Sequence, residues 1–252
     1  MCIRDSEYMN PRWYEDTPDV HAAPGRYEPE VQTDLAIHWL ERQRESGEDR
    51  PFCLFVSYGP PHDPYVPGPP GMGALYDPER LTLRANVPEQ LAVGERADLS
   101  NYYAHITAID QQLGRLVDFL RNCNILDETL VAFSSDHGTM LGSHGRYAKQ
   151  LPFEEAVAIP LVMRGGPHLG PLGRNEKLLI GIVDIAPTLL GLLGQPADIR
   201  MQGLDLSGHI ADPTLPDPPS SVCLENALVV DRSRIWGVRP CLLYTSPSPR
   251  DR

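Results

Sequence analysis

Apolar side chains recur at helical spacing in two parts of the chain. In residues 31–44 and again in residues 101–121, they step mainly by three and four positions. Both stretches are predicted to be helices with one buried face. We expect Ser100 to be the N-cap of the second helix, because a serine hydroxyl accepts hydrogen bonds from free backbone amides at a helix start.

Short apolar runs predict the strands of a buried sheet. They are residues 52–57, which we expect to form a central strand, and residues 129–134, 159–163 and 178–183. A short helix is predicted over residues 186–193, with Pro187 near its first turn. Because strands and helices alternate along the chain, the sequence predicts an α/β fold.

The two ends of the chain differ from the rest. Residues 1–6 and 241–252 resemble translated sequencing-adapter read-through, and we expect both to be artefact tails outside the fold. Between them we expect one domain over residues 7–210 and the start of a C-terminal region over residues 211–240, which opens with a proline-rich stretch.

Charge and composition exclude several classes of protein. The formal net charge of −12 argues against nucleic acid as a partner. No apolar run is long enough to predict a membrane span. The cysteines outside the tails are Cys53, Cys123 and Cys223, an odd and scattered set that does not predict a disulfide framework.

A carboxylate and an imidazole follow the strand predicted over residues 129–134. Asp136 and His137 lie where open α/β sheets hold their ligands, beyond the carboxyl end of a strand. Asp136 is a candidate ligand for a hard cation, and His137 is a candidate ligand beside it, although imidazole is more usual on Zn²⁺ or Mn²⁺. The alternative is a turn, in which Asp136 caps the backbone and His137 binds a carbonyl.

Candidate anion-binding residues lie in two loops. His62 lies among prolines in the loop after residues 52–57, where a stiff backbone would hold its imidazole to donate to an anionic oxygen or a leaving group. Lys149 would be a point charge for sulfate or phosphate. His144 and Arg146, in the same loop as Lys149, are further candidates for contacting substrate. The alternative for each is an exposed polar side chain with no ligand.

Two histidines are assigned structural roles. His38 and His105 both lie within the predicted helices rather than in the loops that follow strands.

In combination, these segments resemble the sulfatases of the alkaline phosphatase superfamily, in particular arylsulfatase-like and iduronate-sulfatase-like members. The resemblance runs in order over residues 27–210. The matching stretches are residues 51–57 with Pro61-His62, residues 103–115, residues 135–145, Lys149 with residues 152–155, residues 159–162, and residues 183–190 with Gln202-Gly203.

The resemblance implies an alkaline-phosphatase-like mixed sheet flanked by helices, incomplete on its N-terminal side, with residues 7–210 as part of the catalytic domain. Asp136 and His137 match the C-terminal pair of metal ligands, for Ca²⁺ in most relatives, with Mg²⁺ and Mn²⁺ as alternatives. His62 and Lys149 match the sulfate-binding and catalytic histidine and lysine.

The resemblance also implies parts that this sequence lacks. Relatives attack sulfur with a formylglycine, made within a Cys/Ser-x-Pro-x-Arg signature, and they carry paired aspartates in an N-terminal half of the metal site. Neither occurs here, and both precede this region in the family. We therefore expect a truncated sulfatase that is inactive alone. Thr139 and Ser143 stand where many relatives carry acidic residues.

The implied partner is a sulfated small molecule or carbohydrate, and the implied location is periplasmic or extracellular. One alternative is a phosphonate monoester or phosphodiester hydrolase of the same superfamily, which would share Asp136 and the fold. Another is a non-catalytic binding relative with a degraded site.

Overall fold

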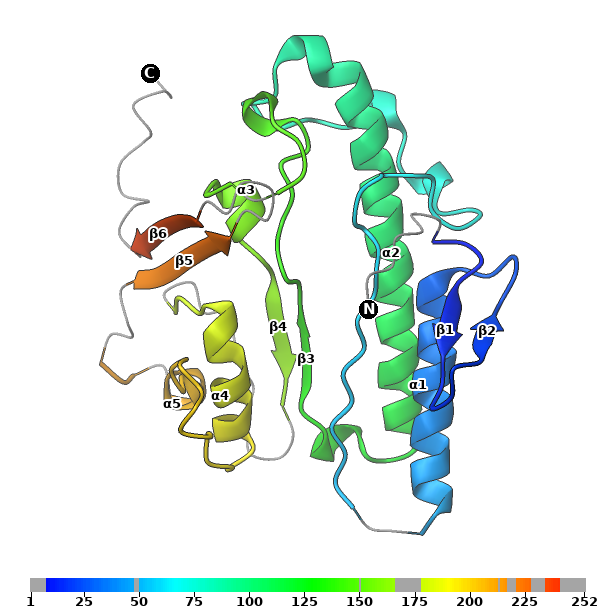
Figure 1. Cartoon of the computed structure of the whole chain (residues 1–252), viewed down its shortest axis with the longest axis vertical. Helices are drawn as coiled ribbons and strands as arrows, with labels where there is room; N and C mark the ends of the chain where they lie inside the picture. The colour runs from blue at the N-terminus through cyan, green and yellow to red at the C-terminus, as the bar shows by residue number, and fades with distance from the viewer. Residues whose placement is uncertain are drawn as a thin grey trace. The chain divides into compact units, whose positions relative to one another are not determined.

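The computed structural model describes residues 8–47, 50–149, 151–165, 178–212, 214–216, 221–227 and 234–240 (Figure 1). The chain divides into two compact units. The first unit comprises Met1–Asn124 and Met140–Ala148, and the second comprises Ile125–Thr139 and Lys149–Arg252. The two predicted artefact tails, residues 1–6 and 241–252, lie outside the described residues.

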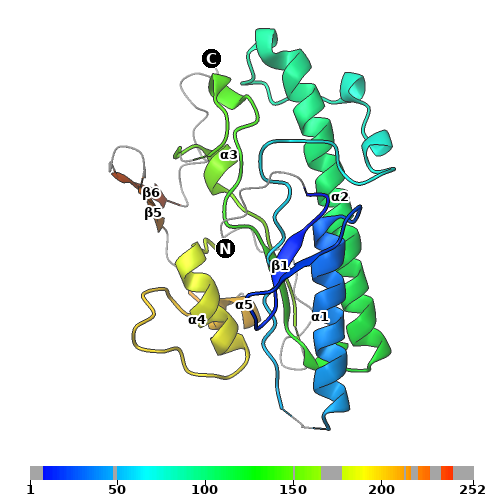
Figure 2. The same ribbon diagram turned by 45° about the vertical axis from the view of Figure 1, so that its right-hand side comes forward.

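Two long helices dominate the first unit. Helices α1 (Glu28–Glu45) and α2 (Ala92–Asn122) lie side by side in both views (Figures 1 and 2). The other elements of this unit are the antiparallel strands β1 (Arg12–Tyr14) and β2 (Val20–Ala22) and the 3-10 turns Gly73–Leu75, Pro78–Arg80, Glu89–Leu91 and Ser143–Gly145. Its buried centre gathers around Tyr8, Tyr27 and Ala108.

Both predicted helices are confirmed, but the second begins earlier than its apolar period indicates. Because α2 starts at Ala92, Ser100 lies inside the helix and is not its N-cap. The Ser100 hydroxyl donates instead to the carbonyl of Tyr76, at 2.5 Å. The first turns of α2 are rich in charged residues, so they carry no apolar period from which their helical state could be predicted.

Residues 52–57 do not form the predicted central strand. The segment is extended, with Leu54 and Val56 half-buried and Phe55 89% exposed, so its side chains alternate as in a strand. Among the described residues, however, no neighbouring strand pairs with it. A strand is defined by its ladder of hydrogen bonds, which an apolar run cannot form alone.

In the second unit, strands β3 (Val131–Ser134) and β4 (Leu161–Arg164) confirm two of the predicted strands. They pair antiparallel, with Val131 opposite Arg164 and Ser134 opposite Leu161. The other elements of this unit are the 3-10 turn Leu126–Glu128, helices α3 (Glu154–Val157), α4 (Ile182–Leu192) and α5 (Ser207–Ala211), and the antiparallel strands β5 (Ser221–Ala227) and β6 (Arg234–Pro240).

The strand predicted over residues 178–183 is wrong, because helix α4 already begins at Ile182. The carboxylate of Asp184 accepts from the backbone amides of Gly181 and Leu204, both at 2.8 Å, and so fixes the helix start. Pro187 has no amide to donate to the Val183 carbonyl one turn earlier. Gly203 packs against that carbonyl, and a Cβ at Gly203 would lie only 1.9 Å from it.

In the part of the chain that the structure describes, no helix has both the length and the apolar character needed to cross a membrane.

Candidate active site

His62 lies in the proline-rich loop of the first unit, and about half of its side chain is exposed. Its Nδ1 lies 2.6 Å from the carbonyl of Asp63 and 3.4 Å from the Asp63 carboxylate. Because a carbonyl only accepts hydrogen bonds, Nδ1 must carry a proton. Only in the protonated ring can Nε2 also donate, to an anion or to a leaving group.

The start of this loop is held by buried polar groups of α1. The amide of Gly59 donates to the carboxylate of Glu28, and the hydroxyls of Tyr58 and Thr33 are bonded at 2.8 Å. Burial raises the pKa of Glu28 above its usual value, although the Gly59 amide opposes the shift. Glu28 and Thr33 are both buried, so these contacts fix the loop from inside the fold.

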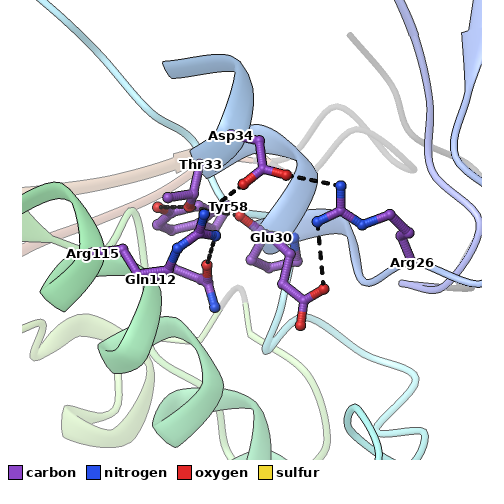
Figure 3. Close-up of polar contacts among 8 residues, drawn as sticks. Arg26, Glu30, Thr33, Asp34, Tyr58, Gln112 and Arg115 are labelled. Carbon is purple, nitrogen blue, oxygen red and sulfur yellow. Dashed lines mark hydrogen bonds and ion pairs between the residues drawn. The ribbon is translucent and has the colours of Figure 1, made fainter. Parts of the chain in front are cut away.

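An ion-pair cluster beside Tyr58 ties α1 to α2 (Figure 3). The Asp34 carboxylate accepts from Arg26 at 2.8 Å and from Arg115 of α2 at 2.6 Å. Burial alone would raise the pKa of Asp34, but the hydrogen bonds from Arg115 and Arg26 outweigh it, so this pKa is lowered. The cluster is structural, and it holds together the two helices that carry the His62 loop.

Asp136 and His137 occupy the turn after β3, in the second unit. The Asp136 side chain is 84% exposed, and its Oδ1 accepts from the His137 amide at 3.0 Å. The His137 Nδ1 donates to the carbonyl of Gly138 at 2.8 Å. In the neutral ring this leaves the lone pair on Nε2, which is the tautomer that a metal-binding histidine needs.

The backbone of α3 fixes this turn. The amide of Gly138 donates to the carbonyl of Ala156 at 2.8 Å, and the Ser135 hydroxyl donates to the carbonyl of His137 at 2.8 Å. A Cβ at position 138 would lie 2.1 Å from the carbonyl oxygen of Glu155. Glycine is therefore required for the chain to pass this close to α3.

The two donors fit part of a metal site. Asp136 Oδ2 and His137 Nε2 lie 3.5 Å apart. Two atoms that bind one ion at roughly 2.0–2.6 Å, at right angles, lie about 3–3.5 Å apart. Among the described residues, no three His, Cys, Asp or Glu side chains gather closely enough to hold an ion. Since Ca²⁺ takes about six to eight ligands, these residues supply only a share of them.

His144 and Arg146 lie in a tightly turned loop of the first unit, residues 140–148. Both side chains are exposed. The amide of Gly142 donates to the carbonyl of Arg146 at 3.0 Å, and the amide of His144 donates to the carbonyl of Asn86 at 2.9 Å. His144 has a positive φ of 56°, as do several neighbours in this loop. Such a conformation is costly for residues other than glycine, so surrounding contacts must enforce it.

Glu95 of α2 lies directly against this loop. Its side chain is buried, 1% exposed, and its carboxylate is hydrogen-bonded to the hydroxyl of Tyr147. Burial raises the pKa of Glu95, and the Tyr147 hydrogen bond opposes this rise. A Cβ at Gly142 would lie 2.6 Å from the Glu95 side chain, so only glycine leaves room for the loop to pack over it.

The candidate residues therefore fall into separate groups. The structure brings Asp136 to His137, and it places His144 and Arg146 in one short loop. His62 belongs to the first unit with that loop, whereas half-buried Lys149 belongs to the second unit.

The family model described as Sulfatase matches residues 3–195, which is most of the chain. This chain belongs to the sulfatase family. An ulvan-active sulfatase from Formosa agariphila is 32% identical over 245 residues, covering 96% of this chain and 46% of that protein. The chain thus spans about half the length of the curated relatives it matches.

Solved sulfatase structures confirm the predicted α/β fold of the alkaline phosphatase type. A candidate sulfatase from Bacteroides fragilis has a TM-score of 0.82 at 26% identity, covering 93% of this chain and 52% of that one. A phosphonate monoester hydrolase from Agrobacterium radiobacter has a TM-score of 0.71 at 23% identity, covering 83% and 48%, and shows likeness of fold alone.

The sequence analysis did not single out several residues that hold the loops of the candidate site. They are Tyr8, Glu28 and Glu95. Their contacts join segments far apart in the chain, so no local spacing reveals them. The sequence offers one signal, which is position: Glu95 lies shortly before residues 103–115, which match the family.

Proposed function

We propose that the whole protein hydrolyses a sulfate ester and that this chain supplies part of its catalytic domain. The observation that carries the proposal is the Asp136–His137 pair, whose donor atoms lie 3.5 Å apart at the end of a strand in a sulfatase-family chain. Asp136 presents its exposed carboxylate there, and the His137 ring is held by the hydrogen bond from its Nδ1 to the carbonyl of Gly138.

In this proposal each candidate has a separate role. Asp136 and His137 hold a divalent cation, Ca²⁺ in preference to Mg²⁺ or Mn²⁺, which would supply positive charge for a sulfate group. His62 and Lys149 bind the sulfate and stabilise its developing charge. His144 and Arg146 contact the rest of the substrate. The nucleophile is a formylglycine, whose signature this sequence does not contain.

We propose a sulfated carbohydrate as the substrate. Support comes from the ulvan-active sulfatase, to which 96% of this chain is similar. The exposed cation Arg146 and the exposed His144 suit a polyanionic sugar chain beyond the sulfate that is cleaved. Because a long, charged sugar chain does not cross a membrane readily, we propose a periplasmic or extracellular location.

Metal binding tests the proposal without any need for activity. Mn²⁺ added to the purified chain should broaden the NMR signals of residues 136–138, because the ion is paramagnetic. A titration of this broadening gives the apparent affinity for Mn²⁺. We expect Asp136→Asn to weaken that affinity by more than about tenfold, since even the loss of a residue that only supports a metal ligand costs that much.

The matched control is Asp127→Asn, which removes an exposed carboxylate of the same unit that pairs with Arg164. It should leave the broadening at residues 136–138 intact. Absence of broadening in the unsubstituted chain would contradict the proposal and favour a binding relative with a degraded site.

The 252-residue chain by itself should not hydrolyse an aryl sulfate, with or without Ca²⁺. It lacks the formylglycine signature, and its described residues bring together only two metal donors. The measurement is a colorimetric assay of the purified chain at high enzyme concentration. Metal-dependent turnover that survives purification to constant specific activity would refute the prediction.

A phosphonate monoester hydrolase is the second candidate, because a protein of that name shares the fold at a TM-score of 0.71. Resequencing the source DNA across both ends of the chain, followed where needed by an assay with both kinds of ester, separates the two. An upstream frame with paired aspartates and Cys/Ser-x-Pro-x-Arg leaves either activity open to an assay with sulfate and phosphonate esters. A frame with a different nucleophile favours the phosphoester activity.

A further inference from the structure

Three aromatic side chains form a buried cluster behind the His62 loop. Tyr27 and His105 are each 1% exposed and Tyr8 is 7% exposed. The Tyr8 ring meets the His105 ring edge-on with centroids 4.9 Å apart, and Tyr27 stacks on His105 at 5.7 Å. The cluster joins the N-terminal segment, the start of α1 and the middle of α2.

Hydrogen bonds fix the tautomer of His105. Its Nε2 lies 3.0 Å from the carbonyl of Val66, which only accepts, so Nε2 carries the proton. Nδ1 of the neutral ring then accepts from the hydroxyl of Tyr27, at 2.8 Å. Burial lowers the pKa of His105, which keeps the ring neutral and this arrangement intact.

Hydrogen bonds from this cluster hold the backbone of the loop at two places, His62 and Val66. The Tyr8 hydroxyl donates to the carbonyl of His62 itself, and His105 donates to the carbonyl of Val66, four residues later. Asn101, one turn before His105 on α2, donates to the carbonyl of Tyr65 at 2.8 Å. The backbone is thus held from inside while the His62 ring remains half-exposed.

We propose that Tyr8, Tyr27 and His105 are positioning residues for His62. They fix the backbone of its loop so that Nδ1 donates to the Asp63 carbonyl and the protonated ring binds sulfate through Nε2. The inference rests on the proposed function, in which His62 binds sulfate. Without the cluster, the His62 ring would exchange between tautomers and its loop between conformations. Sulfate binding would then have to order both, and this loss of conformational entropy would weaken the affinity.

NMR of the full chain, labelled with ¹⁵N-histidine, tests the proposal without any activity. Tyr8→Phe removes the donor to His62, and Tyr27→Phe removes the donor to His105, while each keeps its ring. We expect the His62 imidazole to pass from one tautomer to a mixture in both variants. Amide exchange at His62 and Val66 should rise by roughly five- to tenfold, as the loss of one hydrogen bond allows.

Tyr76→Phe is the matched control. It removes a hydroxyl that is bonded to Thr107, also on α2, and not to the backbone of the His62 loop. The control should leave the His62 tautomer and the exchange of His62 and Val66 unchanged. A change in the control as large as in Tyr8→Phe would overturn the proposal, because it would show a general loosening of α2.

His105→Gln provides a second route if a tyrosine variant fails to fold. Glutamine keeps a donor near the place of Nε2 but has no ring whose tautomer Tyr27 could fix. Adding Tyr27→Phe to His105→Gln should therefore not raise the amide exchange rates of His62 and Val66 any further. An unchanged His62 tautomer in the Tyr8 and Tyr27 variants would overturn the proposal. In the unsubstituted chain, a His62 ring with a single tautomer whose NMR signals do not change when sulfate is added would instead count against the proposed function.

Discussion

At the scale of single residues, close backbone approaches explain glycines that a motif alone leaves unexplained. Gly138 follows the Asp136–His137 pair, and its amide binds the carbonyl of Ala156. Gly203 follows Gln202 and packs on the carbonyl that Pro187 leaves without a donor. In both places the glycine provides room for a neighbouring carbonyl, and at Gly138 this fixes the turn that carries Asp136 and His137.

Gly138→Ala should destabilise the chain by about 1–3 kcal/mol, because the new Cβ would collide with the Glu155 carbonyl and force the turn away from α3. Urea denaturation followed by circular dichroism measures the loss. The control is Gly114→Ala in α2, where nothing lies within 4 Å of the added Cβ.

That control should stabilise the helix by about 0.5–1 kcal/mol, the usual difference between glycine and alanine inside a helix. If both variants had the same stability as the unsubstituted chain, the close approach at residue 138 would be disproved.

At the scale of elements, the pairing of α1 with α2 relies partly on charge. Asp34 is the one carboxylate of the labelled cluster in Figure 3 that meets arginines from two directions, Arg26 before α1 and Arg115 on α2. Its side chain is 38% exposed, so solvent screens the interaction and its energy is modest. The ion-pair cluster therefore adds a small contribution to a helix pair that is stabilised mainly by apolar burial.

Asp34→Asn should lower stability at pH 7 by less than about 1 kcal/mol. The folded pKa of Asp34 lies below its usual value of 3.8, so its contribution is present above that value and disappears as the pH falls through the lower, folded pKa. Urea denaturation of both proteins at pH 7 and near pH 3 should show the difference between them shrinking in acid. A difference that grows in acid would contradict the assigned role.

Elements with a strong local period could be predicted from the sequence, and elements defined by distant partners could not. Helix α1 and strands β3 and β4 lie close to their predicted positions. Residues 52–57 have the composition of a strand but no partner among the described residues, and residues 178–183 became a helix start once Asp184 capped it. A capping contact to Leu204, twenty residues away, leaves no trace in a short window.

The candidate site shows the same division. The proximity of Asp136 and His137 could be predicted, because the strand, the carboxylate and the imidazole are consecutive in the sequence. The hold on His62 could not, because Tyr8, Tyr27 and His105 come from three segments and meet only in the fold. The structural role predicted for His105 agrees with its burial and with its hydrogen bond to the carbonyl of Val66, although the sequence does not show that this carbonyl belongs to the His62 loop.

At the scale of the whole molecule, the sulfatase-family relationship covers most of the chain, whereas the candidate site residues are spread over both compact units. Asp136, His137 and Lys149 belong to one unit, and His62 belongs to the other. Under the proposed function, a substitution that destabilises either unit should impair sulfate hydrolysis in the whole protein, even at a distance from the reacting atoms. Stability measurements must accompany every activity measurement for this reason.

The extended segment at residues 52–57 has a consequence for handling the protein. An apolar stretch that pairs with no strand among the described residues, and that has Phe55 89% exposed, is a template on which a second copy can add a strand. Light scattering should therefore show particle size growing with concentration. Phe55→Lys should suppress that growth, because a charge on the exposed face penalises stacking of copies, whereas Phe52→Lys, at a side chain only 36% exposed, should suppress it less. The growth of particle size would thus report an extended apolar segment that has no strand partner in the described part of the chain.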